Sequence, residues 1–232
     1  MKHRAFFITG TDTGVGKTLV SATLLHLARQ RGLSTAALKP VAAGCEETAA
    51  GLRNEDALRL QAEVSVPLLY EQINPVALQA AIAPHIAARQ ERRSVTVSRL
   101  TGFCRGVLGQ ADFTLVEGAG GWRVPINATE TLADLACELR LPVILVVGIR
   151  LGCINHALLS AEAINRDGLK LAGWVANQLD PAMPCQAENI ATLQHRLGAP
   201  CLGQLRWRQG MDQTAAFASD FDQQALDSLF SG

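Results

Sequence analysis

Residues 6–18, FFITGTDTGVGKT, constrain the fold of this chain more than any other stretch. An apolar run leads into glycines and hydroxyl residues, and a helical pattern follows Lys17 and Thr18, so this order predicts a strand, a loop and a helix. The glycines let the backbone turn tightly and point its N–H groups inward, and the dipole of the helix favours an anion there. We therefore predict a phosphate-binding loop, in which Lys17 reaches the terminal phosphates and the Thr18 hydroxyl holds Mg²⁺.

The spacing of this loop departs from the usual phosphate-loop pattern, G-x-x-x-x-G-K-[ST]. Thr11 stands where that pattern places its first glycine, and Gly10 precedes it, so the loop carries one extra residue. A chance glycine-rich turn is the alternative interpretation. Because strand, loop, Lys-Thr and helix all occur in the required order, we interpret residues 10–18 as a P-loop.

Charge and composition exclude several classes of protein. The 232 residues include 21 Lys and Arg and 21 Asp and Glu, so no overall basic field favours nucleic acid. The longest apolar run is too short for a bilayer, and the N-terminal apolar run ends in the P-loop, so neither a membrane partner nor a signal peptide is expected. Six scattered cysteines without a C-x-x-C pair indicate a reduced, cytoplasmic protein with no disulfide framework or zinc site.

Apolar strand patterns alternate with helical patterns along the chain, and three prolines leave residues 64–84 ambiguous. The predicted strands after the first are 35–38, 112–116, 142–147, 171–176 and 201–205. The predicted helices are about 17–32, 54–63, 85–92, 96–109, 131–140, 155–165, 185–197 and 222–230. This alternation predicts an α/β fold of the P-loop NTPase type, with a parallel sheet covered by helices on both faces, in a single domain over residues 1–232.

Polar and glycine residues follow several of these strands. In an open parallel sheet, ligands bind beyond the carboxyl ends of the strands. The residues at those ends should therefore meet, and they are Gly10, Lys39, Glu117, Gly148 and Asn177.

Two acidic residues are candidate ligands of Mg²⁺, which prefers oxygen. Glu117 ends a predicted strand before a glycine-rich turn, and the alternative is a solvated acid of that turn. Asp56 lies in the first turn of a helix that Asn54 caps, where an acid is explained as well by the helix dipole.

Three further features are candidates for ligand binding. Lys39 follows a strand near the P-loop, where a second lysine would stabilise charge during phosphoryl transfer, or it is an ordinary surface lysine. The amides of Gly152–Asn155 precede a helix, so we expect them to be free to bind a carboxylate, or Asn155 is only the N-cap of that helix. Asn177 ends a strand, where it reads a base edge or closes a turn.

Seven stretches of the sequence resemble the dethiobiotin synthetase family in order and spacing, namely TGTDTGVGKT, KPVAAG, GLRNEDA, VEGAGGW, LPVILVVG, GCINHALL and WVAN. The resemblance covers about residues 6–207, and the extra P-loop residue is a trait of that family. It implies a cyclo-ligase of biotin biosynthesis that converts 7,8-diaminononanoate, CO₂ and ATP to dethiobiotin, ADP and phosphate. It also implies a Mg²⁺ cofactor, a carbamate and a carbamic-phosphoric anhydride as intermediates, and a homodimer.

The resemblance also implies roles for individual residues. Lys17 and Lys39 are the implied catalytic residues, which flank the carbamate and the transferred phosphoryl group. The implied metal ligands are Thr18, Asp56 and Glu117. The implied nucleotide-binding residues are Gly14, Val15, Gly16, Lys17, Thr18, Asp56, Glu117, Gly118, Ala119, Gly120, Asn177, Gln178, Arg206 and Trp207. The implied substrate-binding residues are Thr13, Lys39, Ala43, Gly152, Cys153 and Asn155.

Three positions depart from the pattern of that family. Gly14 stands where some relatives carry an acid, so any role of that side chain is absent here. Ala43 stands where relatives often have serine, so a hydroxyl contact to the substrate is lost. Gln178 stands where an acid is familiar, which leaves the choice among ATP, GTP and CTP open.

Two other functions on a related fold stay open at this stage. A ParA/MinD-like regulatory ATPase would show no bicarbonate-dependent turnover, and its membrane form needs a basic tail, whereas residues 209–232 are acidic. A GTPase is suggested by the NQLD stretch at residues 177–180, which resembles the N-K-x-D guanine motif but lacks its lysine.

Overall fold

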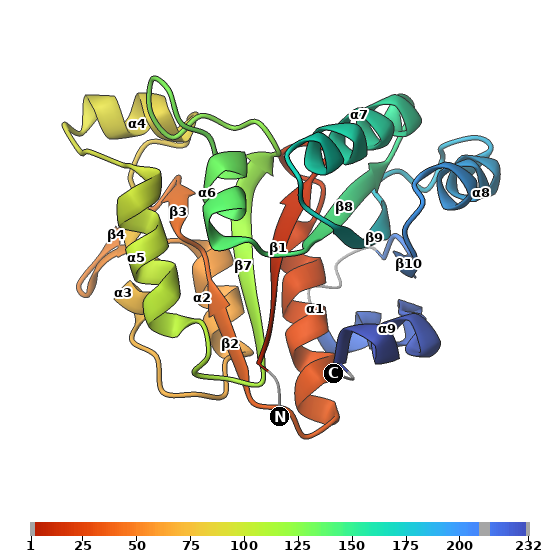
Figure 1. Ribbon diagram of the computed structural model, residues 1–232, viewed down its shortest axis with the longest axis horizontal. Helices are drawn as coiled ribbons and strands as arrows, with labels where there is room; N and C mark the ends of the chain where they lie inside the picture. The colour runs from red at the N-terminus through yellow and green to blue at the C-terminus, as the bar shows by residue number, and fades with distance from the viewer. Residues whose placement is uncertain (1–2, 209–213, 231–232) are drawn as a thin grey trace.

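Six parallel strands form the main sheet of this protein in a computed structural model that describes residues 3–208 and 214–230 (Figure 1). The strands are β1 (Arg4–Gly10), β2 (Thr35–Leu38), β7 (Phe113–Gly121), β8 (Val143–Ile149), β9 (Leu171–Gln178) and β10 (Cys201–Leu205). Their order in the sheet is β10-β9-β8-β1-β7-β2. Since β1 pairs with β7 on one side and β8 on the other, the P-loop that follows β1 lies at the middle of the carboxyl edge.

Helices cover both faces of this sheet. The side chains of β1 alternate, so that Phe6 and Ile8 belong to one hydrophobic layer and Phe7 to the other. The first layer includes α1 (Lys17–Gln30), α2 (Glu55–Ala62), η1 (Thr214–Asp220) and α9 (Gln223–Phe230). The second includes α5 (Val97–Val107), α6 (Leu132–Leu139), α7 (Cys153–Arg166) and α8 (Gln186–Arg196). The predicted fold class, a P-loop NTPase-type parallel sheet with helices on both faces, is confirmed.

The segment between β2 and α5 contains short elements that the sequence pattern left ambiguous. They are β3 (Val41–Ala43), β4 (Glu46–Thr48), β5 (Gly51–Arg53), α3 (Tyr70–Ile73), β6 (Val76–Leu78) and α4 (Pro84–Gln90). Strands β3 and β6 pair in parallel, and β4 and β5 form an antiparallel hairpin. This segment fixes the backbone of Lys39, whose N–H donates to the Ile73 carbonyl at 2.7 Å.

Two predicted element boundaries are wrong. The strand expected to end at Glu117 continues to Gly121, because pairing with β1 resumes at Gly10 after a bulge, so Glu117 lies inside β7 and not in a turn. The helix expected from Asn155 begins at Cys153, because Gly152 at φ 92° already serves as its N-cap. Part of the acidic tail, residues 209–213 and 231–232, lies outside the described residues.

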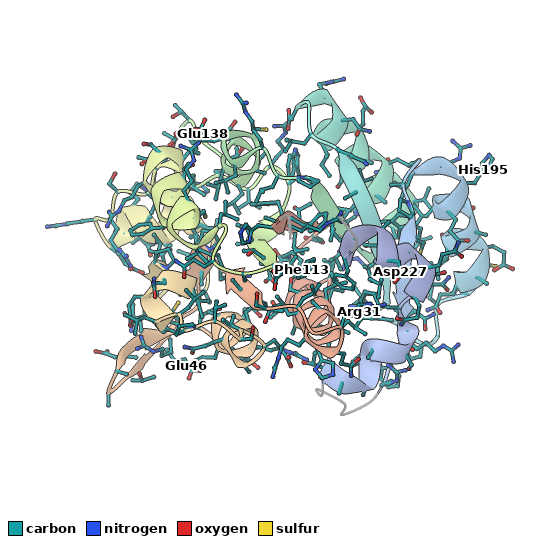
Figure 2. The ribbon with its side chains drawn as sticks, turned by 60° about the horizontal axis from the view of Figure 1, so that its bottom comes forward. Arg31, Glu46, Phe113, Glu138, His195 and Asp227 are labelled. Atoms are coloured by element: carbon teal, nitrogen blue, oxygen red, sulfur yellow. The ribbon has the colours of Figure 1, made fainter. Side chains whose placement is uncertain are left out.

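The first and last described segments lie side by side at the edge of the sheet opposite the P-loop (Figure 1). The Arg4 guanidinium donates to the carbonyls of Ser228 and Leu229 at 2.8 and 2.7 Å. Figure 2 shows Phe113 in the interior, where its ring lies 5.0 Å from that of Phe230. Among the described helices, none is both long and apolar enough to cross a membrane.

Candidate active site

The P-loop is closed against the end of β9. Gly16 takes a left-handed conformation, φ 86°, as the N-cap of α1, and the amide of Asn177 donates to the Val15 carbonyl at 2.9 Å. A Cβ atom on Gly16 would lie 2.2 Å from the Asn177 amide nitrogen, which no real contact allows. The loop therefore requires glycine at this position for two independent reasons, conformation and space.

Gly16→Ala is expected to weaken nucleotide binding on the order of 30-fold or more, because it combines backbone strain with loss of the Asn177 hydrogen bond. Gly14→Ala is the matched control. Gly14 also has a positive φ, 73°, but no atom lies within 4 Å of its added Cβ. We expect the nucleotide affinity of the control to fall by no more than about tenfold, because backbone strain alone acts there. Titration calorimetry with ATP measures both, and equal losses would show that the contact with Asn177 does not matter.

Glu117 lies at the centre of a buried hydrogen-bond cluster behind the P-loop. Its side chain is fully buried in β7. One carboxylate oxygen, Oε1, accepts hydrogen bonds from Lys39 Nζ at 2.6 Å and from the Thr18 hydroxyl at 2.8 Å. The other, Oε2, accepts from the Ser21 hydroxyl at 2.7 Å. The alternative of a solvated turn acid is therefore wrong for Glu117.

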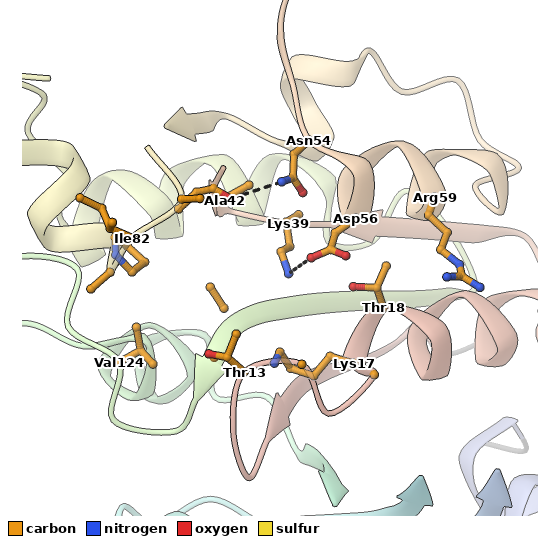
Figure 3. Close-up of a pocket in the computed structure, with 18 of the residues that line it drawn as sticks. Thr13, Lys17, Thr18, Lys39, Ala42, Asn54, Asp56, Arg59, Ile82 and Val124 are labelled. Carbon is orange, nitrogen blue, oxygen red and sulfur yellow. Dashed lines mark hydrogen bonds and ion pairs between the residues drawn. The ribbon is translucent and has the colours of Figure 1, made fainter. Parts of the chain in front are cut away.

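Asp56 reaches the same cluster from the first turn of α2. The Asn54 side chain caps this helix by accepting from the N–H of Ala57 at 3.3 Å, as predicted. The cap directs Asp56 toward Lys39, and Figure 3 shows the ion pair between Asp56 Oδ2 and Lys39 Nζ, 3.2 Å apart. Lys39 itself is only 3% exposed, so the alternative of an ordinary surface lysine is also wrong.

The two lysines of the site experience opposite electrostatic environments. Burial, and after it the charge of Lys39, lowers the pKa of Lys17 from 10.5 to about 8. Burial alone would also lower the pKa of Lys39, but the carboxylates of Glu117 and Asp56 together outweigh it and raise that pKa. Burial likewise opposes the ionised form of Asp56, but Lys39 and the Thr18 hydroxyl hold the pKa of Asp56 below its usual value. Both shifts favour the charged forms of Lys39 and Asp56, which form the ion pair described above.

The donor set of Thr18, Asp56 and Glu117 fits Mg²⁺. Two carboxylates flank the positive charge of the Lys39 ammonium, and the Thr18 hydroxyl donates to one of them, that of Glu117. Among the described residues, no group of three or more His, Cys, Asp or Glu side chains forms a complete cage for a metal. Mg²⁺ suits this arrangement, because it is usually held by one or two carboxylates and completes its shell with phosphate and water.

A cavity of about 760 Å³ opens in front of this cluster. Lys17, Thr18, Lys39 and Asp56 line its polar end. Its other end is largely apolar and is lined by Ala42, Ala43, Ala81, Ile82, Ala83, Pro84, Val124 and Pro125. Figure 3 shows Ile82 and Val124 on the side of the cavity away from α1. One cavity thus joins a phosphate-binding end to a wall that suits an aliphatic chain.

The structure brings together most, but not all, of the predicted site residues. Those that line the cavity are Thr13, Gly14, Gly16, Lys17, Thr18, Lys39, Ala43, Asp56, Ala119 and Gly120. Val15, Glu117, Gly118 and Asn177 lie directly behind these, and each contacts the P-loop or Lys39. Gln178 and Arg206 instead line a separate hollow of about 340 Å³, and Trp207 is 44% exposed.

The predicted carboxylate-binding segment lies apart from this cavity. Gly152 and Asn155 are exposed, and Cys153 is buried. The N–H of Cys153 already donates to the Arg150 carbonyl at 2.9 Å, so the expectation that this amide is free is wrong. The amides of Ile154 and Asn155, in the first turn of α7, keep no acceptor within the helix.

Three contacts of the site were missed from the sequence. The Ser21 hydroxyl donates to the Glu117 carboxylate. The one sequence feature that could have indicated this role is that Ser21 lies three residues after Thr18, on the same face of α1. Asn74 belongs to the segment whose structure the sequence left ambiguous, and its side-chain amide donates to the carbonyl of Lys39 at 2.7 Å. Asp12 of the P-loop forms an ion pair with Arg150, which no local pattern indicates.

Comparisons with known proteins show which family this chain belongs to. The model of a family described as "AAA domain" matches residues 4–215. "ATP-dependent dethiobiotin synthetase BioD" of Cellvibrio japonicus is 70% identical over 88% of this chain and 89% of its own length. The proteins of that name from Pseudomonas paraeruginosa and Marinobacter nauticus are 64% and 56% identical, over 87% and 91% of this chain and 89% and 92% of their own lengths.

Solved structures show the fold relationship alone. The septum site-determining protein MinD of Pyrococcus horikoshii is 15% identical, with a TM-score of 0.55 over 100% of this chain and 90% of that one. A ParA family ATPase of Chlorobium tepidum is 14% identical, with a TM-score of 0.53 over the same shares. At 14–15% identity these structures share only an architecture with this chain, whereas the named relatives are 56–70% identical to it over most of its length. This chain belongs to the dethiobiotin synthetase family.

Proposed function

We propose that this protein is an ATP-dependent dethiobiotin synthase, a ligase that closes the cyclic urea of dethiobiotin in biotin biosynthesis. The observation that carries the proposal is one cavity in which the P-loop and a buried lysine–carboxylate cluster face an apolar wall. The relatives at 56–70% identity that bear the name of this enzyme support it. The ParA/MinD-like alternative rests on the fold alone.

The proposed reaction has three steps. CO₂ adds to one amine of 7,8-diaminononanoate, which forms a carbamate and releases a proton. A carbamate oxygen then attacks the γ-phosphorus of ATP, and the bond to the bridging oxygen breaks with its electron pair on ADP. The second amine attacks the carbonyl carbon of the resulting carbamic-phosphoric anhydride, so that the ring closes as phosphate leaves and the amine loses a proton.

The catalytic roles fall to the two lysines at the polar end of the cavity. The carbamate and the terminal phosphate are both anions, so cations must offset their repulsion before they can react. We assign Lys17 to the phosphates and Lys39 to the acceptor. Thr18, Asp56 and Glu117 would hold Mg²⁺, which supplies Lewis-acid charge at the phosphate oxygens when bound. The apolar wall would orient the aliphatic chain of the diamine.

Binding of the base is assigned to the carboxyl ends of β9 and β10. Asn177 and Gln178 end β9, and Arg206 and Trp207 follow β10. The partly exposed Trp207 ring offers a surface for stacking against a base. We place the enzyme in the cytoplasm, because all six cysteines are free and suit a reducing compartment.

The decisive test is incubation with the diamine, bicarbonate, ATP and Mg²⁺, followed by mass spectrometry of the product. We expect dethiobiotin, and phosphate release that requires both diamine and bicarbonate. Equal phosphate release without bicarbonate would instead favour a regulatory ATPase. Replacing ATP with GTP in the same assay tests the GTPase alternative.

We also propose a homodimer in which the Gly152–Asn155 segment serves the site of the partner. The exposed position of Asn155, outside the cavity of its own chain, supports this arrangement. Two neighbouring apolar side chains, Leu151 and Leu159, are 93% and 56% exposed, as expected of a surface that another chain covers. The amides of Ile154 and Asn155 would then bind the distal carboxylate of the substrate.

Subunit mixing tests this arrangement with two inactive variants. Lys17→Ala removes the ammonium assigned to the phosphates, and Asn155→Asp places a negative charge beside the substrate carboxylate. If Asn155 serves the partner's site, one site of each heterodimer collects both lesions and the other none, so the mixture should recover activity in that intact site. A mixture that exchanges subunits but stays inactive would place the whole site within one chain.

A further inference from the structure

The ammonium of Lys39 has no N–H group to spare. A lysine ammonium has three donors and no acceptor. In this structure Nζ lies 2.6 Å from Glu117 Oε1, 3.2 Å from Asp56 Oδ2 and 3.2 Å from the Gly118 carbonyl. All three donors are thereby committed to the protein. An incoming carbamate or phosphate can be bound by Lys39 only if one of these contacts breaks.

The acceptors of Lys39 are the same carboxylates that are proposed to hold the metal. Asp56 and Glu117 cannot direct these oxygens to a divalent cation and to the ammonium in the same position. A cation bound there would also repel the ammonium at short distance. Lys39 and the metal are therefore competitors for one position in the cluster.

The geometry allows the side chain of Lys39 to leave without moving its backbone. The N–H and carbonyl of Lys39 are fixed by Ile73 and by the Asn74 amide, both at 2.7 Å. The four-carbon stem is flexible, and Lys39 lines the cavity that the substrates would enter. The ammonium can thus move from the carboxylates to the cavity by rotation of the side chain alone.

We infer that, before metal and nucleotide bind, Lys39 occupies the position between Asp56 and Glu117 that a divalent cation takes with the nucleotide, and that Lys39 turns to the acceptor anion when the cation enters. The inference rests on the metal site of the proposed function. It gives Lys39 two roles, the first as an internal counterion and the second as a catalytic residue. It also orders the events, because Lys39 becomes available to the carbamate only after the metal and nucleotide have bound.

Metal binding without nucleotide tests this exchange directly. The free Mn²⁺ signal in electron paramagnetic resonance measures binding to the wild type, Lys39→Met and Lys39→Gln. Both variants remove the competing charge, and Gln keeps hydrogen-bond donors for Glu117. We expect both to bind Mn²⁺ at least about tenfold more tightly than the wild type, since the coupling between two ligands of one position is lost.

Lys17→Met is the matched control. It removes another buried ammonium from the same site, but Lys17 Nζ donates to the Asp12 carbonyl at 3.1 Å, whereas Lys39 Nζ contacts both carboxylates. We expect a much smaller gain in Mn²⁺ affinity. No gain in the Lys39 variants, or an equal gain in Lys17→Met, would overturn the exchange. If a Lys39 variant is unfolded without metal, refolding on addition of Mn²⁺ supports the exchange and failure to refold contradicts it.

A second measurement separates failure of the exchange from failure of the metal site. With the non-hydrolysable analogue adenylyl imidodiphosphate present, a protein that carries only Glu117→Gln should bind Mn²⁺ more weakly than the wild type. If it does, while the Lys39 variants gain no affinity, the metal site stands and the exchange is wrong. If it does not, the metal site itself is wrong and the inference falls with it.

Discussion

A Lys17→Met variant is expected to lose ring closure by on the order of 10³-fold in kcat while keeping its fold. Lys17 lies at the end of the P-loop and is only 7% exposed, so its charge acts on the phosphates with little screening by water. Methionine keeps the buried aliphatic stem and removes only the ammonium. A coupled assay for ADP release, with product detection by mass spectrometry, measures the loss. Turnover near that of the wild type would remove the P-loop from the mechanism.

The stability of the same variant provides its control. Because burial and then Lys39 lower the pKa of Lys17 to about 8, the folded protein holds this charge at a cost that the unfolded chain avoids. Between pH 8 and 10.5 the folded lysine has lost its proton while the unfolded lysine keeps it, so this cost falls as the pH rises. Lys17→Met should therefore be at least as stable as the wild type at neutral pH, and urea unfolding should show that difference shrink toward about pH 10. A less stable variant would indicate a structural role instead.

A Glu117→Gln variant is expected to require at least about tenfold more Mg²⁺ for half-maximal activity and to lose turnover by on the order of 10²-fold. Glutamine keeps the size of the side chain and an oxygen that can accept from Thr18 and Lys39, but it removes the charge that a metal requires. A Mg²⁺ titration at saturating ATP measures both effects. An unchanged titration would exclude Glu117 from the metal site.

Ser21→Ala separates the charge of Glu117 from its orientation. Ser21 is fully buried and donates to Glu117 Oε2 at 2.7 Å, the oxygen that Lys39 and Thr18 do not contact. Its removal keeps the charge and loosens the carboxylate, so we expect a smaller shift of the Mg²⁺ titration than in Glu117→Gln. A shift as large as that of Glu117→Gln would mean that orientation, and not charge, dominates the metal requirement.

The sequence alone predicts the parts of this site whose signal is local. The strand, the glycines, Lys17 and Thr18 of the P-loop lie within thirteen consecutive residues, FFITGTDTGVGKT, and the alternation of strands and helices predicts the parallel sheet. The capped start of α2 is equally local, since Asn54 and the acids that follow are adjacent. Such features depend on neighbours in the chain, so they can be identified before any folding is known.

The remaining parts depend on contacts between distant residues. The glycines after Glu117 have low strand propensity and indicate a turn, but pairing with β1 overrides that propensity and keeps Glu117 inside a strand. Ser21 and Glu117 are 96 positions apart, and a buried hydroxyl leaves no pattern of its own in the sequence. The apolar wall comes from residues 42–43, 81–84 and 124–125, which no periodicity connects.

The neighbouring positions of Arg4 and α9 have a practical consequence for handling this protein. Both described ends of the chain lie at the amino edge of the sheet, while the P-loop and the cavity open at the carboxyl edge. The length of the strands therefore separates both described ends of the chain from the cavity. Tethering either end to a sensor surface should orient the cavity toward the flowing solution, so that nucleotide and metal reach it as freely as they reach the untethered molecule.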